Sequence, residues 1–279
     1  MTILALLSAL ALERVTVKLN HFQGERYAER YYSWLNAKEW LSNDSGSVYW
    51  LLVALIPAFT TSLILNLLPG NLIAFVVEIV VLFVCLGSQT LRNTYKCFIQ
   101  SASRGDLDGC YLHSQAMGHC DTQPDQAPSF GLRLVWLNYQ YYGGVVIAFV
   151  LFGAPGAVFY TLVREGFEFC CKDNDFSVKA IRTVRHWVDW VPVRICSLGM
   201  LLVGNFANGI TVWTSTLFSF AESAVSVITR VSAASEILPT KEDAESDPLL
   251  EPGILVKLAK RNMTFILVVV SLLTVFGVL

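Results

Sequence analysis

The sequence has little charge and no surplus of either sign. Charged residues make up 15% of the 279 positions, and the formal net charge is −2, whereas soluble domains carry about 25% charged residues. A protein that binds nucleic acid needs a basic surplus to neutralise phosphates, and this chain has none. The composition therefore argues against a nucleic-acid partner, and it disfavours an ordinary soluble globular protein.

Several sequence motifs of nucleotide-binding and hydrolytic enzymes are also missing. The chain contains no G-x-x-x-x-G-K-[ST] loop, no G-x-G-x-x-G fingerprint and no G-x-S-x-G elbow. Gly105 and Gly109 lie close together, but no lysine follows them as a phosphate loop requires. The sequence therefore offers no standard nucleotide cradle and no serine-hydrolase nucleophile.

Cysteine usage does not indicate a disulfide framework. There are seven cysteines, an odd number, and most lie in segments that we expect to face the cytoplasm. Cys110, His113, His119 and Cys120 are close in sequence, but their spacing is not that of a zinc finger. We therefore predict no metal site, and no cofactor is indicated.

The chain instead contains several long runs of apolar residues. Between Ser45 and Leu91 the only charged residue is Glu78, and a helix needs about 20 apolar residues to cross a bilayer. Val48–Leu68 and Asn71–Leu91 each fill one span, with the Pro69-Gly70 turn between them. This pattern predicts a membrane hairpin.

Three more charge-free runs follow, and two of them leave alternatives open. Asn262–Leu279 comes after basic residues and predicts a C-terminal transmembrane anchor. Leu134–Val163 contains Gly153-Ala154-Pro155-Gly156, so it either spans with a kink or enters the membrane and turns back. Ile195–Ala221 is rich in glycine and asparagine, and it either packs on the bundle, lies at the interface or spans.

Loop charges indicate the orientation. The Pro69-Gly70 turn has no Lys or Arg, whereas the flanking segments 13–47 and 92–133 together hold nine. The positive-inside rule therefore places the turn outside and both flanks in the cytoplasm. Segment 164–194 holds six more basic residues, which favours a re-entrant hairpin around Gly153 because both of its ends would then lie on one side.

The rest of the chain predicts helices and one linker. Glu25–Leu41 has amphipathic periodicity, either as a helix at the lipid headgroups or as one packed on its neighbours, and Ser101–Met117 is a second amphipathic candidate. Ser232–Gly253 is acidic and contains three prolines, which predicts a mobile linker. The fold class is thus an all-α, polytopic membrane protein that forms a single membrane domain over residues 1–279, with cytoplasmic helical segments at 13–47 and 92–133, a linker at 232–253 and the anchor at 262–279.

Charged residues at the ends of two apolar runs form the candidate site. Glu13, Arg14 and His21 follow the short apolar run Thr2–Leu12, and Asp189 and Arg194 precede the run Ile195–Ala221. Charges at membrane depth are costly when unpaired, so we expect these five residues to converge in a ligand-binding pocket on the cytoplasmic side. A set of interfacial salt bridges is an equally good interpretation.

At these residues the sequence resembles the AmpE family, inner-membrane proteins linked to the regulation of inducible β-lactamase in Gram-negative bacteria. The resemblance is carried by 2–21, 134–165, H-W-V-D-W-V-P-V-R at 186–194 and the closing anchor. AmpE in turn is similar to the CobD/CbiB enzymes of cobalamin synthesis. The shared pattern is the acid–Arg pair at Glu13-Arg14, the following His21, G-x-P-G with the later Tyr160, and D-x-x-P-x-R ending at Arg194.

The chain departs from those synthases where their chemistry is expected. The acidic, asparagine-rich stretch before G-x-P-G and the N-T-L-D segment after it are replaced by L-N-Y-Q-Y-Y at 137–142 and V-R-E-G-F at 163–167. The resemblance therefore implies a non-enzymatic sensor or signalling modulator of the bacterial inner membrane, which binds a cell-wall-derived or lipid-linked ligand or a partner protein. A CobD/CbiB-like synthase with an altered active site is the alternative, and transport ranks third because paired intramembrane charges are missing.

Overall fold

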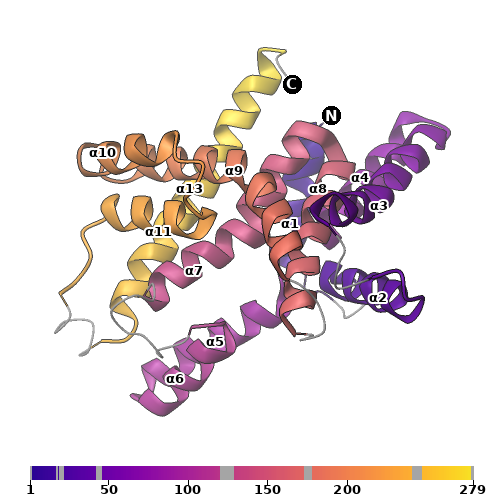
Figure 1. Ribbon diagram of the computed structural model, residues 1–279. Helices are drawn as coiled ribbons and strands as arrows, with labels where there is room; N and C mark the ends of the chain where they lie inside the picture. The colour runs from indigo at the N-terminus through magenta and orange to yellow at the C-terminus, as the bar shows by residue number, and fades with distance from the viewer. Residues whose placement is uncertain are drawn as a thin grey trace. The chain divides into compact units, whose positions relative to one another are not determined.

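A computed structural model describes residues 2–16, 18, 22–41, 46–119, 129–172, 178–240 and 247–277. Every regular element in these ranges is a helix, which confirms the all-α prediction (Figure 1). The elements are α1 (Thr2–Val15), α2 (Gly24–Ala37), α3 (Ser47–Leu67), α4 (Asn71–Cys85), α5 (Gln89–Ser103), α6 (Leu107–Ala116), α7 (Phe130–Asn138), the π-helical turn η2 (Tyr139–Gly143), α8 (Gly144–Lys172), α9 (Val178–Val203), α10 (Phe206–Leu217), α11 (Ala224–Ala234) and α13 (Leu250–Val275).

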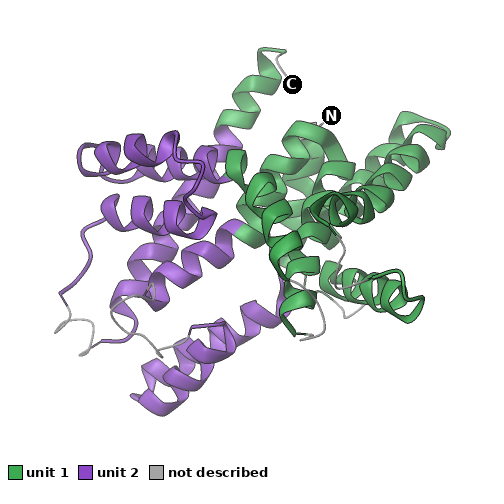
Figure 2. Ribbon diagram, in the orientation of Figure 1, with its two compact units in different colours: residues 1–87, 140–192, 269–279 green, residues 88–139, 193–268 purple. Residues whose placement is uncertain are grey.

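The helices group into two compact units (Figure 2). Unit 1 comprises residues 1–87, 140–192 and 269–279, and unit 2 comprises 88–139 and 193–268. Among the described residues, three helices are long and apolar enough to cross a membrane: Ser47–Leu67, Phe130–Lys172 and Leu250–Val275. The pair α4 and α5 makes a fourth candidate if it is counted as one span. The chain is therefore a helical membrane protein.

The predicted hairpin at Pro69-Gly70 is present in unit 1. Helix α3 has 21 residues, about 32 Å at 1.5 Å per residue, which is enough to cross the hydrocarbon core. It packs against α4 and α8. Gly70 has φ +94°, a conformation that glycine adopts without a steric penalty, and it allows the tight turn into α4.

The second predicted span, Asn71–Leu91, is wrong at its end, because α4 stops at Cys85. Gly87 has φ +63° and cannot continue the helix, and Ser88 starts α5 by accepting a hydrogen bond from the Leu91 amide. The buried Lys18 ammonium donates to the carbonyls of Phe83 and Leu86 at the C-terminal end of α4. A cation at a helix C-terminus satisfies carbonyls that have no partner within the helix.

The broken helix expected around Gly153 is present, and it is a hairpin. Gly153 has φ 68° and ψ −158°, a region of backbone space that is essentially restricted to glycine. The Arg164 guanidinium bonds to the Gln140 carbonyl at 2.9 Å, 24 positions away, although a straight helix would separate them by about 36 Å. A Cβ on Gly144 would lie 2.2 Å from the Tyr160 ring, so the halves before and after Gly153 run side by side.

Helix α2 confirms an amphipathic helix within Glu25–Leu41, although it ends at Ala37, and it packs on α8. Its inner face contributes Ala28, Tyr32 and Leu35 to the core of unit 1, and Tyr32 donates to the Leu162 carbonyl at 2.8 Å. The core also contains Trp50, Val53 and Ala54 of α3, Leu162, Val163 and Cys170 of α8, and Ile181 and Val184 of α9. The buried face of α2 therefore packs on the hairpin that reverses at Gly153, while Tyr27 and Trp34 remain about half exposed.

Unit 2 contains two helix pairs in addition to the ends of longer helices. Helix α5 packs on α6, and α10 packs on α11, which also contacts α7 (Figure 1). The Ser101–Met117 candidate is divided, because α5 ends at Ser103 and Asp106 caps a new helix by accepting from the Gly109 amide.

The apolar run Ile195–Ala221 is broken into two pieces. Helix α9 ends at Val203, and the Asn205 side chain caps α10 by accepting from the Asn208 amide. The Asn205 amide donates to the Ser235 carbonyl at 2.7 Å, which fixes the break to the end of α11. Of the alternatives left open, packing within unit 2 is what these contacts show.

The predicted linker Ser232–Gly253 is helical at both ends. Helix α11 continues to Ala234, with Ser232 buried, and α13 begins at Leu250. Residues 241–246 lie outside the described residues, so the mobility of the linker stays a prediction. Helix α13 contains the anchor predicted at 262–279 as far as Val275.

Candidate functional site

The π-helical turn η2 is the centre of a buried polar cluster in unit 1. A π turn interrupts the regular hydrogen-bond ladder of an α-helix and leaves carbonyls for other partners. The Gln140 carbonyl accepts from Arg164 Nη1 at 2.9 Å, and the Tyr141 carbonyl accepts from the Gly87 amide at 2.9 Å. The turn thereby joins the end of α4 and the returning half of α8.

Glu13 enters this cluster from the last turn of α1. Its carboxylate is buried, with 3% of the residue exposed, and Oε1 accepts from the Tyr142 hydroxyl at 2.8 Å. Gly87 lies against both groups, since a Cβ there would be 2.7 Å from Glu13 Oε1 and 2.8 Å from the Tyr142 oxygen. Glycine at position 87 therefore serves two purposes, a positive φ and space for the Glu13–Tyr142 contact.

Arg164 forms the charged part of the cluster on α8. Its guanidinium is buried, pairs with Glu165 at 2.8 Å and lies 4.0 Å from the centre of the Tyr141 ring. These contacts combine an ion pair, a carbonyl bond and a cation–π contact on one planar group. Removal of Arg164 would leave the largely buried Glu165 without its ion-pair partner.

Asp189 lies on α9 and contacts the same hairpin through Tyr160. Its Oδ1 accepts from the Tyr160 hydroxyl at 2.9 Å, and its Oδ2 lies 3.5 Å from Arg185 Nε. Tyr160 packs against Gly144, directly after η2. Glu13 and Asp189 are thus both buried carboxylates, and each is held by a tyrosine hydroxyl of the hairpin.

The structure places the five predicted site residues in different surroundings. Glu13 and Asp189 belong to the polar cluster of unit 1, whereas Arg14 is exposed in the last turn of α1. His21 lies outside the described residues. Arg194 belongs to unit 2, so its convergence with the other residues stays a prediction.

Arg194 has a well-defined role within unit 2. Its Nε donates to the Leu217 carbonyl at 2.8 Å, and Nη2 donates to the carbonyls of Thr216 and Ser219 at 3.1 and 2.8 Å. These carbonyls are at the end of α10, where the regular helical bonds stop, and the Thr216 carbonyl also accepts from the Ser219 amide at 3.3 Å. The Arg194 guanidinium therefore caps the C-terminal end of α10, and its N–H donors bond to backbone carbonyl oxygens.

Sequence reasoning missed most of the partners that hold the two carboxylates. Tyr142, Gly87 and Arg164 were not singled out as site residues, although all three contact η2 or belong to it. The signal that was available is Arg164, a charged residue at the end of an apolar run that turns back at Gly153. Tyr160 was noticed only as part of the G-x-P-G pattern.

The arrangement holds two buried carboxylates against one hairpin through tyrosine hydroxyls. Each tyrosine hydroxyl uses its single O–H to donate to a carboxylate, so its oxygen can only accept a hydrogen bond from a further group. Within the part of the chain that the structure describes, no group of three or more His, Cys, Asp and Glu side chains could hold a metal ion.

Comparison with known proteins identifies the family. The model of the family described as "Regulatory signalling modulator protein AmpE" matches residues 1–279. Protein AmpE of Shigella flexneri is 25% identical over 244 residues, which cover 81% of this chain and 84% of that protein. No solved structure matches. Because the family model matches the whole length, the chain belongs to the AmpE family of regulatory signalling modulators.

Proposed function

We propose that this protein is a multi-pass inner-membrane sensor in the response that links cell-wall recycling to β-lactamase induction. It binds a small or lipid-linked ligand, or a partner protein, at the cytoplasmic side of the polar cluster formed by Glu13, Tyr142, Arg164, Tyr160 and Asp189. Membership of a signalling family and the helices that are long enough to span a membrane support a signalling role in a membrane. The excess of Lys and Arg in the segments flanking the Pro69-Gly70 turn supports the cytoplasmic side.

The observation that carries the proposal is that both carboxylates are bound by the two halves of one re-entrant hairpin. Tyr142 precedes the reversal at Gly153, and Tyr160 follows it. A ligand that takes the place of either hydroxyl changes a contact within the hairpin. A signal requires a ligand with different affinities for two arrangements of the protein, and a π turn beside a glycine reversal provides an element that can rearrange.

The exposed Arg14 suits the ligand chemistry of this proposal. Arg14 directly follows Glu13 in the sequence. Its guanidinium can bind a carboxylate or phosphate through two parallel hydrogen bonds. A cell-wall-derived or lipid-linked molecule carries such anionic groups. Arg14 thus binds the anionic group of the ligand, and this binding changes the hydrogen bond between Glu13 and Tyr142.

The test is a β-lactamase induction assay in cells that carry the variants Glu13→Gln, Tyr142→Phe and Arg14→Ala. We expect induction to change at least severalfold in each variant, while immunoblots of the membrane fraction show wild-type amounts of protein. The matched controls are Glu29→Gln and Tyr27→Phe on the exposed face of α2, and these should induce normally.

Wild-type induction in all three cluster variants, at equal protein levels, would contradict the proposed site. An altered response in the α2 controls would show that the assay reports general damage to the protein. If the cluster variants fail to reach the membrane, thermal unfolding of the purified proteins distinguishes a structural role from a signalling role.

A further inference from the structure

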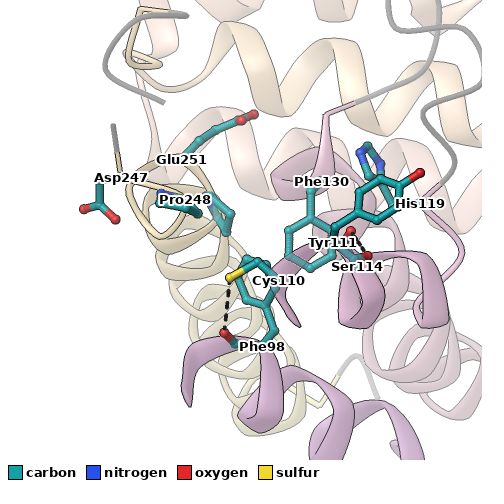
Figure 3. A pocket seen from close by; sticks show the side chains of 10 residues that line it. Phe98, Cys110, Tyr111, Ser114, His119, Phe130, Asp247, Pro248 and Glu251 are labelled. Atoms are coloured by element: carbon teal, nitrogen blue, oxygen red, sulfur yellow. Dashed lines mark hydrogen bonds between the residues drawn. The ribbon is translucent and has the colours of Figure 1, made fainter. Parts of the chain in front are cut away.

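Unit 2 contains a cavity of about 210 Å³ whose lining shares no residue with the polar cluster of unit 1. It is lined by Phe98 of α5, by Cys110, Tyr111 and Ser114 of α6, by His119 after α6, by Phe130 of α7, and by Asp247, Pro248, Glu251 and Pro252 before and within the first turn of α13 (Figure 3). This volume corresponds to roughly seven waters at about 30 Å³ each. A small organic molecule therefore fits.

Aromatic rings form one part of the lining. Phe98 and Phe130 pack with their ring centres 4.5 Å apart, and His119 meets Phe130 edge-on at 5.8 Å. Tyr111 lies on the same side, as Figure 3 shows. Cys110 also contacts Phe98, because the Phe98 carbonyl accepts from the Cys110 thiol at 4.0 Å. The aromatic part is therefore built from several helices and is held in place by packing.

Two carboxylates form the opposite part. Asp247 and Glu251 lie at the start of α13, across the cavity from Tyr111 and His119 (Figure 3). Glu251 is oriented by the Ser129 hydroxyl, which donates to its Oε1. Ser129 also accepts from the Leu132 amide as the cap of α7, so the position of Glu251 is tied to that helix. Asp247 accepts from the Leu249 amide and caps the turn into α13.

We propose that this cavity binds a small organic cation with an apolar or aromatic body. The faces of aromatic rings attract cations, and carboxylates at one end supply the opposite charge. Among the described residues that line the cavity, none is Lys or Arg, so an anionic ligand would find two like charges. The site is independent of the polar cluster in unit 1 and of the function proposed for it.

The probe is benzyltrimethylammonium, titrated into the purified full-length protein in detergent and followed by isothermal calorimetry. We expect saturable binding, and we expect phenylmethanesulfonate, an anion of similar size, to bind far more weakly. Glu251→Gln keeps the hydrogen bond to Ser129 but removes the charge, and it should weaken binding about five- to tenfold. Asp108→Asn on the exposed surface of α6 removes the same charge outside the cavity and should bind like the wild type.

A second measurement does not depend on the carboxylate variants. In variants that retain a single cysteine, the rate of alkylation by N-ethylmaleimide is followed with and without the probe. Cys110 lines the cavity, whereas Cys97 is exposed on α5 outside it. Burial and the Asp106 carboxylate raise the pKa of the Cys110 thiol, so mildly alkaline conditions are needed to form the thiolate.

Protection of Cys110 by benzyltrimethylammonium, with no change at Cys97, is the expected result. Equal affinity of Glu251→Gln and wild-type protein, equal binding of the sulfonate, or unprotected Cys110 at saturating probe would each overturn the proposal.

Discussion

Glu13 Oε1 accepts a hydrogen bond from the Tyr142 hydroxyl at 2.8 Å, although 129 positions separate the two residues. The contact joins the end of α1 to the π-helical turn, and it exists because Gly87 leaves space beside it. Three chain segments therefore depend on one another at this point. Changes to any of them provide tests of the cluster.

Replacement of Gly87 by alanine should destabilise the protein more than an ordinary glycine replacement. Alanine at φ +63° costs about 1–2 kcal/mol, and its Cβ would also displace Glu13 and Tyr142. Gly105→Ala is the matched control, because Gly105 has φ +72° and nothing within 4 Å of a Cβ. Thermal unfolding in detergent measures both. An equal loss in the two variants would show that the Glu13–Tyr142 contact tolerates the extra carbon.

Replacement of Tyr160 by phenylalanine should cost about 1–3 kcal/mol of stability. The change removes the hydroxyl that donates to the buried Asp189 and leaves that carboxylate one partner short. Tyr27→Phe, at a side chain that is 53% exposed, should change stability by less than about 0.5 kcal/mol. Chemical denaturation compares the two. If Tyr160→Phe is as stable as Tyr27→Phe, the bond to Asp189 contributes nothing measurable.

Replacement of Arg194 by alanine should loosen the end of α10. Three carbonyls of residues 216, 217 and 219 lose their guanidinium donors, and the cost should be about 1–3 kcal/mol because these bonds are charge-assisted. Hydrogen exchange of peptides covering 206–220 should accelerate. Arg230→Ala, at an exposed arginine that pairs with Glu222, is the control and should leave these peptides protected.

The same variant also tests the ligand role that the sequence assigned to Arg194. If Arg194→Ala abolishes β-lactamase induction while exchange in α10 stays at the wild-type rate, a ligand role is favoured over the cap. If exchange accelerates and induction is normal, Arg194 is a structural cap only.

The Pro69-Gly70 turn should face the periplasm, because the turn has no Lys or Arg whereas segment 92–133 has four. A cysteine-free protein with a single cysteine at Asn71 should react in intact cells with a thiol reagent that does not cross the inner membrane. A single cysteine at Lys96 should react only after that membrane is permeabilised. The reverse labelling pattern would overturn the assigned orientation.

The sequence by itself determined the apolar hairpin at Pro69-Gly70 and an interruption of the helix at Gly153, whereas the choice between a kink and a reversal came from the structure. Twenty apolar residues without charge have no stable place in water, and Pro69-Gly70 and Gly153-Ala154-Pro155-Gly156 interrupt helices for local reasons of backbone geometry. It also drew attention to Glu13 and Asp189, because a charged group next to an apolar run must find a partner. These features depend on short segments of the chain, so the sequence alone is enough to predict them.

The tertiary structure decided where those partners come from. Tyr142 meets Glu13, and Arg164 meets the Gln140 carbonyl, across separations that no local pattern encodes. The early end of α4 at Cys85 likewise follows from Gly87 and Lys18, whose contacts lie elsewhere in the chain. Arg194 illustrates the same point, since its position at a membrane edge suggested a ligand, while its donors meet the carbonyls of α10. The charge of a side chain is known from the sequence, but the group that neutralises this charge depends on which helices pack together.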